Sequence, residues 1–383
     1  MGLPSCQHDY ARYRDEQDCG HDRRETPPHL CKRGRRWRYA TGLITGCILL
    51  LSAQFLSAET FRVATYNTEL SRKGPGLLLR DTASGDDPQV IAVLDVIKHA
   101  QPDVIALQGF DYDLTNLALR LFADQAGYPH IFAARPNTGM ATGLDLNGDG
   151  RLGGPNDAQG YGRFSGHRGK AVMSKFPINA AKVQNFSALL WRVVPYPSLP
   201  VLNCKPFLPA EVLGTQRLPN TGHWIVPIDG PNGPFHLMTF HATPPVFDGP
   251  EDRNGNRNHD EIRLWQQYLD GHVGEPIATP FVITGDANLD PNTGEGRRRA
   301  IINLLADKRV QDAKPRGDSP TQDTDTVDCS EPRPGNMRVD YVLPSVEWTI
   351  TDSGVLWPQP NDPLADVSKT ASRHHLVWVD ITL

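Results

Sequence analysis

The sequence predicts one α/β domain over residues 59–383. Short apolar runs of strand length alternate there with longer segments whose apolar residues recur at helical spacing. No segment repeats at the period of a solenoid, and no linker divides the stretch. The 34 Gly and 33 Pro residues indicate long loops without reaching the level of a disordered chain. A single mixed domain with long functional loops is therefore the simplest interpretation.

The composition excludes several other classes of protein. Hydrophobic residues make up 39% of the chain and charged residues 22%, as in an ordinary globular protein. Only one apolar run approaches the length of a membrane span, which excludes a multi-span membrane protein. With 44 acidic and 39 basic residues the net charge is −5, so the chain as a whole repels nucleic acid at long range.

Residues 1–58 are predicted to be a polar extension followed by a signal peptide or a membrane anchor. Four arginines between 33 and 38 precede an uncharged, largely apolar stretch over 39–58 that ends in small residues. We therefore expect an exported protein, secreted or periplasmic, or one anchored in the membrane by residues 39–58. Cys204 and Cys329, which follow this segment, either form a disulfide or remain two thiols.

The first elements of the domain are predicted from apolar runs and helix signals. Residues 61–66 have the composition of a strand. Asp87 and Pro88 then start a helix with a regular apolar face, which ends before Pro102. Residues 103–107 consist of Asp103 and a continuous apolar run, which predicts a strand buried on both faces.

The middle of the chain contains two long stretches without clear periodicity. A second helix is predicted over 114–126, before Gly127, and a strand over 171–173. Residues 137–168 are rich in Gly, Asn and Asp and predict a long loop. Residues 185–222 are Pro-rich and fit no single element.

The last part returns to alternating strands and helices. Residues 223–228 and 235–240 predict a hairpin around a turn rich in Gly, Asn and Asp. The remaining expected elements are helices over 261–269 and 297–305 and strands over 281–284, 338–343 and 376–381.

Polar residues recur at the ends of these predicted strands, where catalytic groups of layered α/β proteins often project. They are Asn67, Gln108, His241, Asp286, Asn288, Asp340 and His374. Each lies in a short motif, and the motifs cover residues 63–67, 102–108, 173–178, 239–241, 284–288, 339–345 and 372–374.

In this order the motifs resemble the endonuclease/exonuclease/phosphatase superfamily, which includes pancreatic deoxyribonuclease, apurinic endonucleases, inositol-polyphosphate phosphatases and bacterial sphingomyelinases. The resemblance extends over residues 61–383. It implies a four-layered α/β sandwich in which two packed mixed β-sheets are flanked by helices. It also implies phosphoester hydrolysis with a divalent metal ion, Mg²⁺ or Mn²⁺.

The resemblance assigns roles to individual residues. His374 corresponds to the general base that activates water, and Asp340 to the carboxylate that orients it. His241 corresponds to a donor to the scissile phosphate, and Asp286 to the group that orients the nucleophile. Asn288 completes the catalytic set. Substrate binding is implied for Asn67 and Asn288, and metal binding for Asn67 and Asp286.

Two positions depart from the family pattern. Gly109 stands where the family has a metal-binding Glu, and Arg373 where it has an Asp. Two carboxylates are therefore missing, which weakens binding of a hard cation. Asp111 would partly replace the first as a metal ligand, and Arg373 would bind a substrate phosphate. Unless the backbone at Gly109 has a positive φ angle, Gly109→Glu is expected to tighten magnesium binding.

Two segments have the alternating oxygen ligands of calcium loops, within residues 145–157 and 248–261. The first lacks the final Glu of an EF-hand, because Asn156 stands there. Each segment either binds Ca²⁺ or is a polar loop without a ligand. The expected calcium ligands are Asp145, Asn147, Asp149, Asp252, Asn254 and Asn256.

The sequence thus predicts an exported, metal-dependent phosphoester hydrolase. The acidic domain favours small or lipid phosphoesters over nucleic acid, and a nuclease is the alternative within the superfamily. A further alternative is a catalytically weakened protein that binds phosphate or calcium, because of Gly109 and Arg373. No obligate protein partner is evident, and membrane contact would be only through the N-terminal segment.

Overall fold

The computed structural model describes residues 58–318, 324–329 and 335–383, and Ala58–Leu383 form one compact unit. The predicted extension and signal or anchor segment, except its last residue, lie outside the described residues. Within the described part of the chain, no helix is long and apolar enough to cross a membrane.

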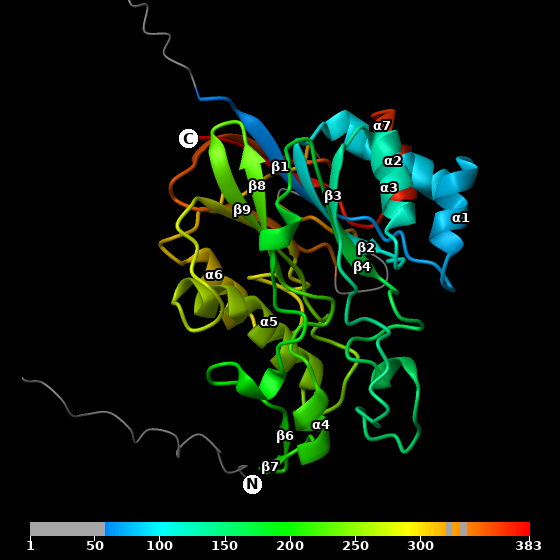
Figure 1. The fold of residues 1–383 in the computed structure, drawn as a ribbon, viewed down its shortest axis with the longest axis vertical. Helices are drawn as coiled ribbons and strands as arrows, with labels where there is room; N and C mark the ends of the chain where they lie inside the picture. The colour runs from blue at the N-terminus through cyan, green and yellow to red at the C-terminus, as the bar shows by residue number, and fades with distance from the viewer. Residues whose placement is uncertain (1–57, 319–323, 330–334) are drawn as a thin grey trace, which may run out of the picture. The chain divides into compact units, whose positions relative to one another are not determined.

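Two mixed β-sheets form the centre of the domain (Figure 1). In the six-stranded sheet the order is β12-β13-β1-β2-β4-β3, with β1 parallel to β2 and antiparallel to β13. Its strands are β1 (Phe61–Asn67), β2 (Val104–Phe110), β3 (His130–Phe132), β4 (Gly169–Ser174), β12 (Thr349–Val355) and β13 (Val377–Thr382).

The five-stranded sheet has the order β11-β10-β9-β8-β5, with β10 parallel to β9 and antiparallel to β11. Its strands are β5 (Gln184–Asn185), β8 (Trp224–Gly230), β9 (Gly233–His241), β10 (Phe281–Asp286) and β11 (Asp340–Pro344). A separate small ribbon pairs β6 (Val201–Leu202) with β7 (Lys205–Pro206).

The two sheets pack face to face through apolar side chains. Val63 and Val104 of the first sheet belong to the same buried cluster as Leu237 and Val282 of the second. At one end of this layer the ring of Phe61 lies 5.4 Å from that of Phe235. The alternation of inward-facing residues along both sheets therefore builds the central core.

Helices cover the outer face of each sheet, as Figure 1 shows. Four pack on the six-stranded sheet, namely α1 (Leu77–Ser84), α2 (Pro88–Ala100), α3 (Leu117–Ala126) and α7 (Leu364–Ala371). Two pack on the five-stranded sheet, namely α5 (Arg253–Leu269) and α6 (Arg299–Leu305). The short α4 (Ala210–Thr215) belongs to a satellite cluster under the long loops. The predicted four-layered α/β sandwich is confirmed.

The segment 252–260 was predicted to be a loop, but it is helical, because α5 already begins at Arg253. Successive residues of a helix are about 100° apart, so positions two residues apart lie on different faces and cannot converge on one ion. The side chains are used elsewhere. The Asp252 carboxylate accepts from Arg297 at 2.8 Å, and the amides of Asn254 and Asn256 donate to backbone carbonyls at 2.7 and 2.5 Å. The calcium loop predicted from Asp252, Asn254 and Asn256 is wrong.

The cysteines give a second result. Cys329 is a free thiol, so no disulfide joins Cys204 to Cys329. The pairing of Cys204 with Cys329 is therefore wrong.

Candidate active site

Strand ends from both sheets bring the predicted site residues together. In the five-stranded sheet, Asp286 at the end of β10 is in register with His241 on one side and Asp340 on the other. In the six-stranded sheet, β1 ends at Asn67, whose Nδ2 donates to Oδ2 of Asp286 at 2.9 Å. His374 precedes β13 and reaches the same point from the first sheet. The two sheets therefore share one polar cluster at their common edge.

The central contact of the cluster joins His374 to Asp340. Nδ1 of the imidazole donates to Oδ2 of the carboxylate at 2.8 Å, which leaves Nε2 directed at Oδ2 of Asp286, 4.0 Å away. Thr326 Oγ1 also donates to Asp340 Oδ2, at 2.9 Å, and fixes its position. Burial lowers the pKa of His374, but the charges of Asp340 and Asp286 outweigh burial and raise it to about 9.

Asp286 accepts hydrogen bonds on both oxygens. Asn67 donates to Oδ2, and the backbone N–H of Asn288 donates to Oδ1 at 2.7 Å. Burial and the negative charge of Asp340 raise the pKa of Asp286. One N–H of the Asn288 amide donates to the carbonyl of Ala242 at 3.0 Å, and the second has no partner among the described residues, so it is available to a ligand in the cavity.

His241 is the second imidazole of the cluster. Its Nε2 lies 3.4 Å from Oδ2 of Asp286, and its Nδ1 is buried without a partner among the described residues. Burial lowers the pKa of His241 to about 3, helped by the positive charges of His374, Arg168 and Lys170. The ring is therefore neutral and can donate one hydrogen bond, as a phosphate-binding role requires.

A cavity of about 810 Å³ opens over this cluster. Asn67, His241, Asn288 and His374 all line it. A substrate phosphate can therefore reach the imidazole nitrogens from solvent, which a purely structural histidine would not need.

Among the residues that the structure describes, one group of three acidic or histidine side chains has the spacing of metal ligands. The ligand atoms of Asp286, Asp340 and His374 all lie within 4.8 Å of one another. Oδ1 of Asp340 is buried and has no hydrogen-bond partner there. Two neighbouring carboxylates and an unpaired oxygen fit a divalent cation, so this group could bind a metal.

Gly109 has a backbone conformation that explains the missing carboxylate. Its φ angle is +68°, in the left-handed region that disfavours side chains. A Cβ atom at Gly109 would lie 2.5 Å from Oδ1 of Asn67 and 3.0 Å from the backbone nitrogen of Glu69. The end of this strand therefore has no space for a side chain at position 109. Gly109→Glu was expected to tighten magnesium binding only if the φ angle were not positive, and this condition is not met.

Glu69 is the site residue that sequence reasoning missed. Its carboxylate forms a two-point contact with Arg373, through Nη2 at 2.5 Å and the backbone N–H at 3.0 Å. Burial would raise the pKa of Glu69, but Arg373 and His374 lower it to about 2. The sequence signal that could have identified Glu69 is its position, because it is an acidic residue two positions after the predicted site residue Asn67. The positive charge of Arg373 is thus already balanced, and its contact with a substrate phosphate stays a prediction.

Asp111, proposed as a substitute metal ligand, is not part of the Asp286 group. Its Oδ2 accepts from the backbone N–H of Arg72 at 2.7 Å and its Oδ1 from that of Arg168 at 2.9 Å. Burial raises the pKa of Asp111 to about 6. The carboxylate holds two loop segments together, which occupies both of the oxygens that a metal would need.

The other predicted calcium loop, 145–151, is a loop as expected. Oδ1 of Asp145 accepts from the N–H of Gly148 at 2.7 Å and Oδ2 from that of Gly150 at 2.8 Å. Asp149 accepts from the amide of Asn147 at 3.2 Å. These bonds close a compact turn with exposed carboxylates, and calcium binding there stays a prediction.

If this loop binds Ca²⁺, the protein should melt at a higher temperature in millimolar calcium than in chelator. A ligand that binds only the native state stabilises it by about 2.7 kcal/mol at a hundredfold excess over Kd. Thermal unfolding of wild type and Asp145→Asn in both buffers measures this. Equal melting temperatures for wild type in the two buffers would show that the loop binds no calcium.

Comparisons with known proteins agree with this geometry. Residues 64–374 match the Endonuclease/Exonuclease/phosphatase family. None of the curated proteins is similar enough to the chain to count as a match.

Among solved structures, an endonuclease/exonuclease/phosphatase from Beutenbergia cavernae DSM 12333 is 21% identical, with a TM-score of 0.51 over 85% of this chain and 72% of that one. Sphingomyelinase C from Streptomyces griseocarneus is 17% identical, with a TM-score of 0.47 over 84% of this chain and 99% of the other. A family protein from Leptotrichia buccalis C-1013-b is 15% identical, with a TM-score of 0.47 over 84% of this chain and 100% of the other.

The first of these similarities supports the fold, and the family match covers nearly the whole described domain. The match begins within β1 and ends at His374, so it includes every strand end that contributes to the cluster. The chain belongs to the endonuclease/exonuclease/phosphatase family.

Proposed function

We propose that this protein hydrolyses phosphoesters with a water molecule activated by His374. The observation that carries the proposal is the 2.8 Å contact between His374 Nδ1 and Asp340, which leaves Nε2 facing the cavity beside Asp286. A carboxylate on Nδ1 fixes the tautomer in which Nε2 carries no proton, and it stabilises the imidazolium that forms when Nε2 takes one. Nδ2 of Asn67 lies 3.4 Å from this Nε2.

The other residues have complementary roles in the proposal. Asp286 orients the attacking water, and the neutral His241 donates to a phosphoryl oxygen. The side chains of Asn67 and Asn288 bind the phosphate from the two sheets. Because these groups are fixed by hydrogen bonds before the substrate arrives, the reaction needs little reorganisation of the site.

A divalent cation, Mg²⁺ or Mn²⁺, is part of this proposal. Asp286 and Asp340 would hold it, since they are the two carboxylates of the group with metal-ligand spacing. A bound cation supplies charge stabilisation at phosphoryl oxygens and lowers the pKa of water. In this arrangement the two carboxylates bind the cation and His374 does not. Its imidazole can therefore accept a proton from water.

For the substrate we propose a small or lipid phosphoester, with a nuclease as the second candidate. The net charge of −5 favours the first. A panel assay of the purified protein tests both: bis-p-nitrophenyl phosphate, p-nitrophenyl phosphate, sphingomyelin and plasmid DNA, each with Mg²⁺, Mn²⁺, Ca²⁺ or chelator. Turnover of DNA alone would replace the first candidate by the second. If no substrate is turned over, the remaining alternative is a catalytically weakened protein that binds phosphate or calcium.

Export of the protein is a further part of the proposal, because of the basic and apolar pattern in residues 33–58. Cells that express the full chain are fractionated, and mass spectrometry identifies the N-terminal residue of the recovered protein. This distinguishes a cleaved from an anchored form. Recovery of the uncleaved chain in the cytosol would contradict export.

The activity should rise with pH. Nε2 of His374 accepts a proton only from the neutral ring, and the pKa of this ring is about 9. As pH rises through the pKa of the ring, the neutral fraction increases, and kcat/KM should increase with it. A cation on Asp340 and Asp286 offsets their negative charge, so in the metal-bound protein the rise should lie below pH 9. Asp340→Asn removes an anionic cause of the high pKa, so the rise should move to lower pH while the plateau falls. A flat wild-type profile between pH 5 and 9 on bis-p-nitrophenyl phosphate would contradict this role.

A further inference from the structure

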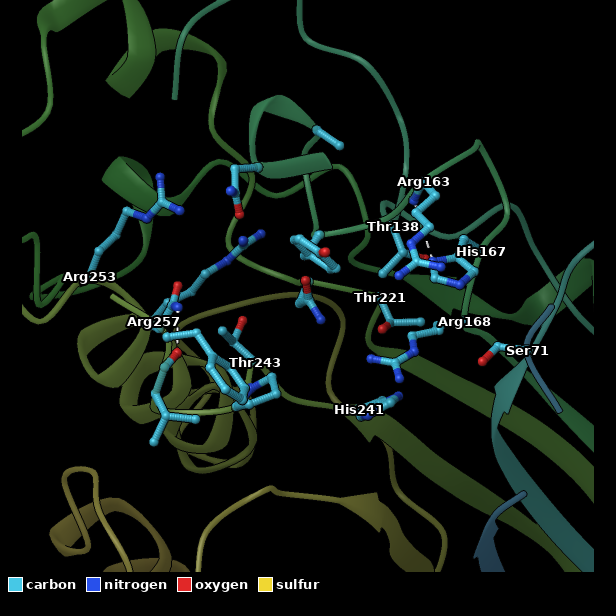
Figure 2. Close-up of a pocket in the computed structure, with 18 of the residues that line it drawn as sticks. Ser71, Thr138, Arg163, His167, Arg168, Thr221, His241, Thr243, Arg253 and Arg257 are labelled. Atoms are coloured by element: carbon cyan, nitrogen blue, oxygen red, sulfur yellow. Dashed lines mark hydrogen bonds between the residues drawn. The ribbon is translucent and has the colours of Figure 1, made fainter. Parts of the chain in front are cut away.

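A second cavity, of about 750 Å³, adjoins the candidate active site. Ser71, Arg168 and His241 line both cavities, so the two adjoin at these residues. Figure 2 shows the lining of the second cavity. Among the described residues, the lining of the second cavity contains six basic side chains and no acidic one. The basic residues are Arg72, Lys73, Arg163, Arg168, Arg253 and Arg257. In a chain of net charge −5, this concentration of positive charge needs an explanation.

Four of the arginines form no ion pair with any carboxylate among the described residues. The guanidinium groups of Arg163 and Arg168 make no hydrogen bond there either, and Figure 2 shows Arg168 above His241. Arg253 donates to the carbonyl of Leu146 at 2.5 Å. Arg72, by contrast, is already paired with Asp81 and Asp87, so it is not counted.

Arg257 is the most deeply buried of these cations. It donates only to backbone carbonyls, to Leu218 at 2.8 Å and Gln159 at 2.6 Å. Burial lowers the pKa of Arg257 to about 10, so it is charged at neutral pH. The nearby Glu261 does not balance it by contact, because its two oxygens accept from the N–H groups of Asn220 and Thr243. The charge of Glu261 acts on Arg257 without contact, and an anion in the cavity would add a direct partner for this guanidinium group.

Two hydroxyl groups in the same lining lack partners. Oγ1 of Thr138 and of Thr221 are buried and make no hydrogen bond within the described part of the chain. The two side chains are 2% and 0% exposed. Figure 2 shows both side chains among those that line the cavity. Buried hydroxyls without partners are rare in folded proteins, and a ligand with several acceptor oxygens would satisfy them.

We propose that this second cavity binds a phosphate group of the substrate other than the one that is hydrolysed. The inference rests on the proposed function, and it narrows the substrate to a small molecule with at least two phosphate groups. A phosphate monoester has up to two negative charges and three acceptor oxygens, which matches several guanidinium groups and hydroxyls better than a carboxylate does. The cavity is a bounded volume beside His241, which suits a terminal phosphate.

Direct binding tests the subsite separately from hydrolysis. Hexane-1,6-diyl bisphosphate and hexyl monophosphate are titrated calorimetrically into the full chain at 150 mM salt, using wild type, Arg163→Gln/Arg253→Gln and the control Arg192→Gln. Arg192 is exposed and lies outside both cavities. The bisphosphate should bind wild type and the control at least about tenfold more tightly than the monophosphate. The double variant should lose this advantage and keep the monophosphate affinity.

Three outcomes would overturn the proposal. The two ligands bind wild type equally, or the double variant keeps the full advantage, or an eight-residue single-stranded oligonucleotide binds more tightly than the bisphosphate and displaces it. In the last case the cavity takes nucleic acid. Retained bisphosphate selectivity with no turnover in the panel assay would reject the hydrolase and keep the subsite, so the two failures are distinguishable.

Discussion

Replacing His374 with Ala should lower kcat by ~10²–10⁴-fold, because a positioned base contributes about that much to proton transfer. Asp340→Asn should cost less, since the imidazole remains but loses the carboxylate that fixes its tautomer at 2.8 Å. The two residues act on one proton, so the double variant should be little worse than His374→Ala. Rates on bis-p-nitrophenyl phosphate for the three variants measure this.

The matched control is His272→Ala, which removes an exposed imidazole outside both cavities. It should leave kcat unchanged. Circular dichroism and urea unfolding establish that each variant is folded, since His374 is itself buried. Losses that multiply independently in the double variant would show that His374 and Asp340 do not work as a pair.

The strands and helices that the sequence predicted well have strong local signals. Residues 104–107 are continuously apolar and begin β2 (Val104–Phe110), which is buried along its length. Asp87 caps α2 by accepting from the N–H of Val90 at 2.9 Å, as the Asp-Pro start indicated. By contrast, the sequence did not predict β12. This strand is largely exposed, and its mostly polar residues do not show the alternation of apolar and polar side chains that indicates a strand.

The first turns of α5 were mistaken for a loop for a different reason. Their Asn, Asp and Gly residues are poor helix formers, so local propensity favours a turn. In the fold, Asn258 donates to the carbonyls of Thr243 and Ala287, both at 2.7 Å, and Arg257 donates to three others. Contacts with distant segments therefore stabilise the helix, and no local pattern contains that information.

In the candidate site, too, some features could be predicted from local sequence and others depend on the fold. The strand-end positions of Asp286, Asp340 and His374 could be predicted, because a strand end fixes where a side chain emerges. The contact between Glu69 and Arg373 could not, because it depends on the backbone turn next to Gly109. The basic cavity could not either, since its arginines come from loop residues 72, 163 and 168 and from α5, which only the fold brings together.

Gly109→Ala and Gly109→Glu should destabilise the protein by about 2 kcal/mol or more. Two costs add at this position. A residue with a side chain is strained at a φ angle of +68°, and the new Cβ would lie 2.5 Å from Oδ1 of Asn67. The gain in magnesium affinity expected from the sequence should therefore not appear, because a Glu at 109 displaces Asn67 before its carboxylate can reach a metal.

Gly127→Ala separates these two costs. Gly127 has a φ angle of +84°, but a Cβ there would meet nothing within 4 Å. It should lose only the conformational part, about 1 kcal/mol. The free energies of unfolding in urea give the comparison, and kcat of the folded fraction should fall for Gly109→Ala only, since only that change disturbs Asn67 and, through its 2.9 Å contact, Asp286. If Gly109→Glu is as stable as wild type and needs less Mg²⁺ for full activity, the backbone constraint at this strand end is wrong and the family's metal position is intact.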